Sequence, residues 1–315
     1  MTCGIHYDPF LENHRTGRGH PEKSNRSTHV YENLRKSGLL ENTQTLNIRS
    51  GTEEELLLVH EMDYLRRAKF EIKNQFSTLS SGDTQVCQLS WEVALRATGG
   101  VLQAVDHVFK KTNKRAFCLT RPPGHHATPG KGMGFCIFNH VAIAARYAQN
   151  NFGVGKILIV DWDVHHGNGT QETFYDDDTV LFLSTHQSPW YPGTGSENET
   201  GRKNGLGYTL NFPFPAGTGR KDIVDKVFGE ELPRKVAEFK PELILISAGF
   251  DSREGDPLGN FYLQDEDFSD LTKIIVELAE EHCHGRVVST LEGGYSLEGL
   301  ASASLAHLSS MVYRL

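Results

Sequence analysis

The stretch Lys156–Gln171, KILIVDWDVHHGNGTQ, constrains the fold of this chain more than any other. Its apolar run, Ile157–Val160, is typical of a strand buried on both faces of a parallel sheet. Asp161, Asp163 and His165 follow at steps of two, so in an extended chain their side chains point to the same side. Because unpaired carboxylates are costly to bury, this pattern predicts a divalent metal site at the end of a strand.

A simpler interpretation has to be weighed against the metal site. A single aspartate at a strand end more often caps a helix or binds a loop. A third ligand would favour the metal, and Asp251 is the candidate, because it follows a second apolar segment and Gly249. Asp163, His165 and Asp251 would leave one coordination position for water or substrate, as in catalytic rather than structural zinc sites.

Apolar runs alternate with helical patterns along the 315 residues. This alternation predicts an α/β fold: a single domain over residues 1–315, with a central, mostly parallel sheet of about eight strands and helices on both faces. The expected strands cover residues 3–7, 115–120, 157–160, 179–184, 208–212, 242–247 and 286–290. The main expected helices cover residues 22–37, 62–76, 90–111, 139–151, 170–175, 222–239, 265–282 and 297–313.

Further chemically active side chains follow other predicted strands. Parallel α/β sheets place ligands at the carboxyl ends of their strands, so these residues are expected to converge. His125 and His126, in RPPGHH, are candidates for general base and acid, although such a pair can also be a polar surface feature. Tyr295, in LEGGY, is positioned to donate a hydrogen bond to an oxyanion, although a lone tyrosine more often only packs.

Composition narrows the class of protein. A net charge of −8 gives no basic footprint for nucleic acid. The five scattered cysteines form no C-x-x-C motif, which argues against a disulfide framework or a thiolate zinc site and indicates a reducing compartment. No apolar run approaches the roughly 20 residues of a membrane span, and the first residues show no signal-peptide pattern. We therefore expect a cytoplasmic protein.

Six motifs together resemble the histone deacetylase family, within the arginase/deacetylase fold. They are RPPGHH, GFCIFN, DWDVHHGNGTQ, SPWYPGTG, SAGFDSREGDPLG and LEGGY. Asn168, where class I members carry Asp, makes the chain similar to class II and to the bacterial-type amidohydrolases of this family. The resemblance implies a zinc-dependent hydrolase that removes acetyl or other acyl groups from lysine side chains of proteins or peptides. The metal would be one catalytic Zn²⁺, or Fe²⁺ in vivo.

The resemblance also implies roles for individual residues. Asp163, His165 and Asp251 would bind the metal. His126 would be the general base and His125 its electrostatic partner, oriented by Asp161, while Tyr295 would polarise the scissile carbonyl. The remaining implied substrate positions are Phe135, Tyr191 and Gly134 along the acyl-lysine tunnel, Leu258 at its mouth, Asp83 at the rim, and Arg26 in an internal acetate channel.

Family members also bind structural potassium. The residues matching the first potassium site are Asp161, Asp163, His165, Ser184 and Thr185. The second site usually involves residues near Phe174, Val180 and Tyr208, and its match here is partial because Asp177 replaces a hydroxyl residue.

Three alternatives remain open. The chain could deacetylate polyamines or other small N-acetyl amines, but polyamine-specific relatives carry Glu where this chain has Leu258. A non-catalytic acyl-lysine binding module is less favoured, because weakly active relatives have His in place of Tyr295. A two-metal, arginase-like hydrolase would need Asp where His125 and His126 stand. The oligomeric state is not assigned.

Overall fold

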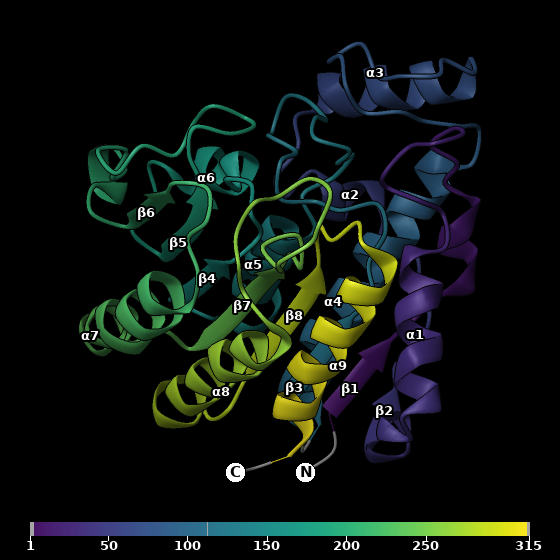
Figure 1. The fold of residues 1–315 in the computed structure, drawn as a ribbon. Coiled ribbons are helices and arrows are strands. Elements are labelled where there is room, and N and C mark those ends of the chain that lie inside the picture. Colours follow the sequence, from purple (N-terminus) through teal and green to yellow (C-terminus); the bar gives the residue numbers. More distant parts are fainter. Residues whose placement is uncertain (1–2, 112, 314–315) are drawn as a thin grey trace.

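The fold is built on one eight-stranded sheet in which every pair of neighbours is parallel (Figure 1). The computed structural model describes residues 3–111 and 113–313. The predicted domain limits, residues 1 and 315, lie outside these ranges. The strands are β1 (Cys3–His6), β2 (Thr43–Thr45), β3 (Arg115–Cys118), β4 (Ile157–Asp161), β5 (Val180–Gln187), β6 (Thr209–Phe214), β7 (Leu243–Ala248) and β8 (Val287–Leu291), in the spatial order β2-β1-β3-β8-β7-β4-β5-β6. The predicted α/β class and parallel sheet are confirmed.

Helices cover both faces of the sheet, with α8 and α9 in front and α4 and α5 behind in Figure 1. The helices are α1 (Arg26–Lys36), α2 (Glu53–Leu56), α3 (Met62–Lys73), α4 (Ser90–Lys110), α5 (His140–Phe152), α6 (Asn168–Phe174), α7 (Leu232–Phe239), α8 (Asp265–His282) and α9 (Leu297–Val312), and the short or irregular ones are η1 (Pro9–Asn13), η2 (Leu39–Asn42), η3 (Lys203–Gly205) and η4 (Lys221–Glu231). None of these helices has the length and apolarity required to span a bilayer.

The central strand β4 shows why the sheet is covered on both sides. Leu158 and Val160 belong to the core beneath α1, η4, α8 and α9. Ile157 and Ile159 belong to the opposite core, beneath α4 and α5. Because side chains alternate along a strand, a continuous apolar run fills both cores at once. The run therefore suits β4 to an inner position in the sheet, between β5 and β7.

Helix α1 begins at Arg26, four residues later than predicted, and two other elements differ more from the sequence prediction. Strand β2, Thr43–Thr45, was not expected, because its three polar residues carry no apolar signal and it forms only by pairing with β1 at the sheet edge. The predicted helix at 222–239 is divided into a π-helix, η4, and a regular helix, α7. The change occurs next to Pro233, which has no N–H to donate to a helical hydrogen bond.

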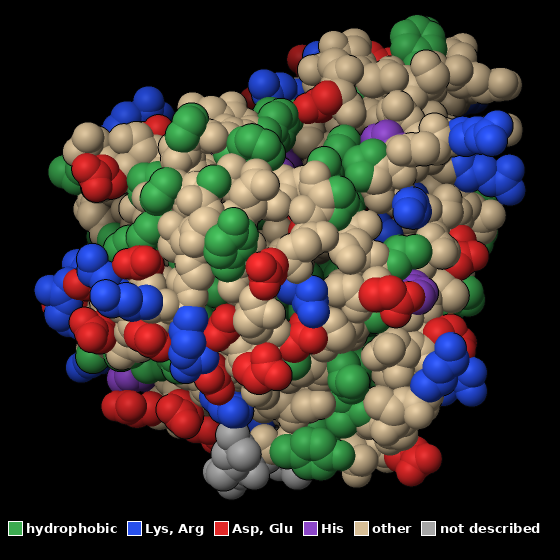
Figure 2. All heavy atoms as spheres, in the orientation of Figure 1, with side chains coloured by type: hydrophobic (Ala, Val, Ile, Leu, Met, Phe, Trp, Pro, Cys, Tyr) green, Lys and Arg blue, Asp and Glu red, His purple; other side chains and the backbone are tan. Residues whose placement is uncertain are grey.

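Charged side chains of both signs cover the face shown in Figure 2. Lys and Arg side chains are intermingled there with Asp and Glu side chains and do not gather into one basic patch. All five cysteines are free thiols, as the sequence predicts.

Candidate active site

The predicted site residues converge on one cavity at the carboxyl ends of the strands. β4 ends at Asp161, β7 ends three residues before Asp251, and β8 ends four residues before Tyr295. The cavity has a volume of about 370 Å³. Its lining residues are Asp83, His126, Gly134, Phe135, His165, Trp190, Tyr191, Leu258 and Tyr295. The residues that line the cavity come from segments up to 212 residues apart, Asp83 to Tyr295.

Asp163, His165 and Asp251 form a buried cluster at the base of this cavity. Their potential ligand atoms all lie within 4.8 Å of one another. Nδ1 of His165 lies 3.0 Å from Oδ1 of Asp163 and 3.2 Å from Oδ2 of Asp251. In the described part of the chain, this is the one group of three or more His, Cys, Asp or Glu side chains with such geometry. Two buried carboxylates and an imidazole are a donor set that suits a divalent cation.

The local backbone differs in detail from the expected strand. Strand β4 stops at Asp161, so Asp163 and His165 lie beyond it in a bend. Two side-chain to backbone hydrogen bonds shape that bend: the N–H of Asp163 donates to Oδ1 of Asp161 at 3.1 Å, and the N–H of His165 donates to Oδ1 of Asp163 at 2.9 Å. Asp side chains commonly replace ladder hydrogen bonds in this way. The spacing of two residues still brings the side chains of Asp161, Asp163 and His165 close together.

Backbone donors also stabilise the two cluster carboxylates. Gly293 donates its N–H to Oδ2 of Asp163 at 2.8 Å, and Val164 donates to Oδ1 of Asp251 at 2.9 Å. Burial opposes ionisation of Asp163, but the charge of His125 and the hydrogen bonds of His165 outweigh it and hold the pKa of Asp163 well below its usual range. Burial and the neighbouring Asp163 raise the pKa of Asp251. The carboxylate of Asp163 is thus strongly held in its ionised form.

His125 and His126 sit side by side with different electrostatic partners. Nδ1 of His125 lies 2.9 Å from Oδ2 of Asp161. Burial would lower the pKa of His125, but Asp161 and Asp163 raise it to about 10. Nδ1 of His126 instead lies 2.8 Å from Oδ1 of Asn168. Burial, together with His125 and His165, holds the pKa of His126 well below its ordinary value. At neutral pH, His125 therefore carries the proton and His126 is a neutral base.

Aromatic rings form the walls of the cavity. The ring of Tyr191 meets that of His126 edge-on, with centroids 5.1 Å apart, and Phe135 meets Tyr295 in the same way at 5.9 Å. A Cβ atom on Gly134 would come within 2.2 Å of the His126 ring, so only glycine fits there. These contacts make a narrow, largely apolar passage down to the buried cluster.

Two residues border the outer end of the passage. Asp83 is exposed and accepts hydrogen bonds from the N–H of Gly134 at 3.0 Å and from the hydroxyl of Tyr191 at 2.6 Å. Leu258 lines the same cavity, and its carbonyl accepts a hydrogen bond from Nε1 of Trp190 at 2.9 Å. The predicted rim residue Asp83 and the predicted mouth residue Leu258 are therefore both brought to the cavity.

Arg26 lies behind Tyr295. Its guanidinium donates to the carbonyls of Gly294 and Glu292, both at 2.7 Å, and lies 4.9 Å from the centroid of the Tyr295 ring. Arg26 does not line the cavity itself. Its buried counter-ion, Glu22, was not identified from the sequence and lies 3.3 Å from Nη1 of Arg26. Glu22 also binds Arg121, at 2.7 Å and 2.8 Å. The only sequence signals for this group were the charges in GRGHPE and RPPGHH.

Glu292 is a second residue that sequence reasoning missed. Its buried carboxylate accepts the N–H groups of Gly124 at 2.6 Å and His125 at 3.1 Å, and the hydroxyl of Ser247 at 3.1 Å. Burial raises the pKa of Glu292 to about 7. These contacts fix the backbone of the two-histidine loop. The sequence signal for Glu292 was the acidic residue within the LEGGY motif.

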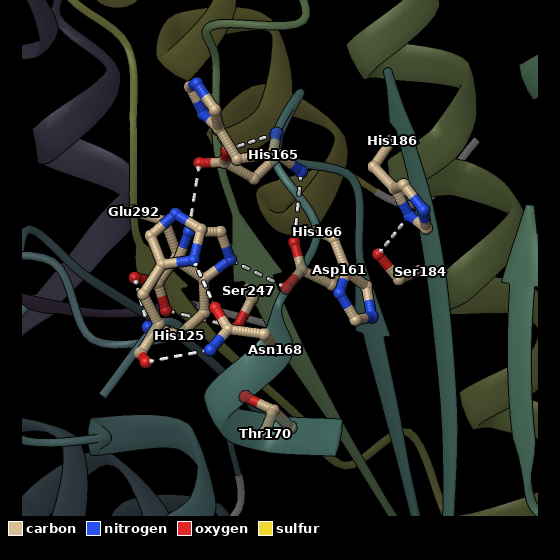
Figure 3. A network of polar contacts seen from close by, with 12 residues as sticks. His125, Asp161, His165, His166, Asn168, Thr170, Ser184, His186, Ser247 and Glu292 are labelled. Atoms are coloured by element: carbon tan, nitrogen blue, oxygen red, sulfur yellow. Dashed lines mark hydrogen bonds and ion pairs between the residues drawn. The ribbon is translucent and has the colours of Figure 1, made fainter. Parts of the chain in front are cut away.

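The residues matched to the first potassium site are also close together. Asp161 of β4 and Ser184 of β5 are direct neighbours in the sheet, and Ser184, Thr185 and Asp163 are buried. The hydroxyl of Ser184 lies 3.0 Å from Nδ1 of His186 (Figure 3). At the second, partial site, the Asp177 carboxylate accepts from the N–H and hydroxyl of Thr179 and pairs with Arg146 at 2.6 Å.

Comparisons with known proteins agree with this geometry. Residues 20–311 match the sequence model of the histone deacetylase domain. The chain is 40% identical over 301 residues to a probable deacetylase of Archaeoglobus fulgidus, covering 95% of this chain and 83% of that protein. It is 42% identical over 268 residues to the chloroplastic histone deacetylase 14 of Arabidopsis thaliana, covering 82% of this chain. The match spans 63% of the Arabidopsis protein, less than two thirds of its length.

A solved structure extends the likeness to the whole fold. The crystal structure of the HDA15 HD domain superposes with a TM-score of 0.93 and 33% sequence identity, covering 99% of this chain and 90% of that one. Its likeness supports the eight-stranded parallel architecture, and the sequence matches support common descent. The chain belongs to the histone deacetylase family.

Proposed function

We propose that this protein is a zinc-dependent amidohydrolase that removes acetyl or other acyl groups from lysine side chains of proteins or peptides. One observation carries the proposal: the buried cluster of Asp163, His165 and Asp251 lies at the base of a narrow aromatic cavity, beside the neutral His126. An extended acyl-lysine side chain fits such a passage, because its apolar stem matches the walls and its amide reaches the polar base.

Asp163, His165 and Asp251 would hold one divalent ion, Zn²⁺ or Fe²⁺. Their buried, partly ionised oxygens and one imidazole nitrogen fit such an ion by charge and by ligand type. When bound, the ion supplies Lewis-acid chemistry, polarising a carbonyl and lowering the pKa of water.

The protein's own side chains would carry out the proton transfers and stabilise the developing charge. His126, kept neutral, accepts a proton from the attacking water, while His125, kept cationic by Asp161, stabilises nearby negative charge. Burial holds the pKa of Tyr295 well above its ordinary value, so its hydroxyl stays protonated and donates to the developing oxyanion. A protonated histidine then donates to the leaving nitrogen. The products are a free amine and the carboxylate of the acyl group, which is acetate for an acetyl substrate, and Arg26, behind Tyr295, would line the route by which acetate leaves.

Two further assignments are part of the proposal: a structural potassium ion, from the family resemblance, and a cytoplasmic location, from the sequence pattern. Asp161, Asp163, His165, Ser184 and Thr185 offer buried oxygen ligands that would suit a structural K⁺. A cytoplasmic location remains a prediction, and the Arabidopsis relative is named as chloroplastic.

A second candidate function is deacetylation of acetylated polyamines. One observation favours it: the carboxylate of Asp83 lines the cavity that Leu258 also lines, so the mouth does contain a negative charge that could attract an ammonium group. Both oxygens of Asp83 already accept hydrogen bonds, which reduces that attraction.

A metal and substrate panel tests the proposal. Purified protein should contain about one divalent ion per chain and should hydrolyse acetyl-lysine peptides, longer acyl-lysine peptides or both. His126→Ala should keep the metal and lose about 100-fold or more in kcat, whereas Asp251→Asn should lose the metal. Full activity after stringent chelation, with removal of the ion verified, would refute the metal assignment. A wild type that cleaves acetylspermidine but no acyl-lysine peptide would select the second function.

A further inference from the structure

The loop of residues 14–24 borders the aromatic wall of the cavity. The ring of His20 meets the ring of Phe135 edge-on, with centroids 4.6 Å apart, and Phe135 lines the cavity. The N–H of Arg15 donates to Sγ of Cys87 at 3.2 Å. In Figure 1 the loop lies above α1, at the end of the molecule towards which the strands point. Side chains of this loop therefore lie beside any substrate whose acyl-lysine occupies the cavity.

Contacts within the loop hold its backbone in a defined conformation. The hydroxyl of Thr16 donates to the carbonyl of Glu22 at 2.7 Å, and the N–H of Glu22 donates to Nδ1 of His20 at 3.1 Å. Gly17 and Gly19 have φ angles of 88° and 84°, which residues with a Cβ atom rarely adopt. A backbone that is already ordered presents its side chains without an ordering cost in the binding step.

The outward side chains of the loop carry only positive charge. Arg15, Arg18 and Lys23 are exposed, and none of the three forms an ion pair with another residue that the structure describes. The one carboxylate of the loop belongs to Glu22, which is buried and pairs with Arg121 at 2.7 Å. The loop therefore displays three cations to the solvent and no anion.

This local excess of positive charge contrasts with the rest of the protein. The whole chain has a net charge of −8, and the residues that line the cavity include one carboxylate, that of Asp83. Exposed cations beside a binding cavity attract groups of opposite charge and raise their association rate. An extended peptide advances by about 3.3 Å per residue, so a side chain two or three positions from the acyl-lysine lies about 7–10 Å away along the surface. Acidic side chains at these positions suit the charge of the loop.

We propose that Arg15, Arg18 and Lys23 make the enzyme select acyl-lysines that have acidic residues two or three positions away in the same peptide. This inference rests on the proposed deacylase function and names a substrate class for it. The three cations act on the residues that flank the acyl-lysine, and the chemistry at the buried cluster does not depend on them.

Three acetyl-lysine peptides of equal length test the inference on the 315-residue, metal-loaded enzyme. Two positions from the acetyl-lysine, on both sides, one peptide has aspartates, one has asparagines and one has lysines. The measured quantity is the ratio of kcat/KM for the aspartate peptide to that for the asparagine peptide. We expect the wild type to give a ratio of about five, because exposed charge pairs each contribute only modestly. The lysine peptide should be the poorest substrate. The ratio should approach one in about 1 M salt, where the Debye length is about 3 Å.

A loop variant assigns the preference to the three cations. It replaces them all by glutamine: Arg15→Gln, Arg18→Gln and Lys23→Gln. Its ratio should fall close to one, while its kcat/KM for the asparagine peptide stays at the wild-type value. A second variant keeps the charge, with Arg15→Lys and Arg18→Lys, and should keep most of the preference, which a dependence on arginine packing would not allow.

A matched control removes the same charge elsewhere. Its three exposed lysines lie outside the loop, at the end of α1 and shortly before β4 and β7: Lys36→Gln, Lys156→Gln and Lys240→Gln. This control should keep the wild-type ratio, because the substituted positions are not at the carboxyl ends of the strands.

The outcomes separate the two levels of the argument. A wild type that hydrolyses the asparagine peptide with a ratio at or below one overturns the inference and leaves the deacylase function intact. So does a folded loop variant that keeps the wild-type ratio. If thermal melting shows that the loop variant does not fold, the three single glutamine variants take its place, and each should lower the ratio. A folded, metal-loaded wild type that hydrolyses none of the three peptides refutes the proposed function itself.

Discussion

Replacing Asn168 by Asp should move the acid limb of the pH–rate profile to higher pH. Asn168 accepts at 2.8 Å from Nδ1 of His126, the proposed general base, which would have to be neutral to act. The substitution keeps the size and the hydrogen bond but adds a negative charge, which favours the protonated imidazole. Protonated His126 would therefore persist to higher pH, and activity would begin at a higher pH than in the wild type.

The size of the shift follows from Coulomb's law. Unit charges about 4 Å apart interact by about 4 kcal/mol at an effective dielectric constant of about 20. At about 1.4 kcal/mol per pKa unit, this gives an upper limit of about three units. Asn168 is only partly buried, so water screens part of the interaction. We expect the acid limb to rise by about one to two units. Both proteins would carry the same proposed ion, so its field would largely cancel in the difference between their pKa values.

The assay is kcat/KM for an acetyl-lysine peptide between pH 5 and 9, at constant ionic strength, for wild type and Asn168→Asp. Asn198→Asp is the control, because Asn198 is exposed and its substitution adds the same charge away from the cavity. If both variants retain the wild-type acid limb within experimental error, the titrating group is not His126, and its assignment as the base is wrong.

Two further predictions test other parts of the structure. Leu258→Glu should shift the preference from acetyl-lysine peptide towards acetylspermidine, measured as the ratio of kcat/KM values, because it adds a counter-charge at the mouth. The wild type should favour the peptide at least about tenfold, or about 1.4 kcal/mol. A wild type that prefers acetylspermidine would contradict this prediction. Glu22→Gln should lower the free energy of unfolding in urea by about 3–5 kcal/mol, because it leaves the buried guanidiniums of Arg26 and Arg121 without their counter-ion. Glu32→Gln, which breaks an exposed pair, should leave it nearly unchanged; equal effects of the two variants would mean that burial is irrelevant.

The sequence was sufficient to predict the sheet and the buried cluster because both rest on local patterns. The continuous apolar run Ile157–Val160 predicts a strand that is buried on both faces of a sheet. Because the carboxyl ends of parallel strands lie at one edge of the sheet, polar residues that follow several strands are expected to lie together there. Asp163, His165 and Asp251 do meet there. Their chemical roles are still predictions, as are the limits of the domain.

Interactions that depend on the tertiary fold could not be read from the sequence. The bond between Tyr191 and Asp83 joins residues 108 positions apart, and either residue alone is unremarkable. Glu292 and Glu22 are charged residues that a local pattern assigns to the surface, yet each is buried by partners from distant segments. Strand β2 has no apolar pattern of its own and forms only by pairing with β1. In each case the determining partner lies elsewhere in the chain.

The N–H donors around Asp163 and Asp251 affect how ion binding and folding are linked. Gly293, His165 and Val164 hold these carboxylates through hydrogen bonds of the backbone itself. Little rearrangement is then needed when an ion arrives, so its binding free energy is expressed as affinity rather than as the driving force for folding. This distinguishes the protein from a zinc finger, which is unfolded without its metal. If the proposed ion binds at this cluster, the protein would keep its shape when the ion leaves, and the local supply of zinc and iron would help to determine which ion it carries.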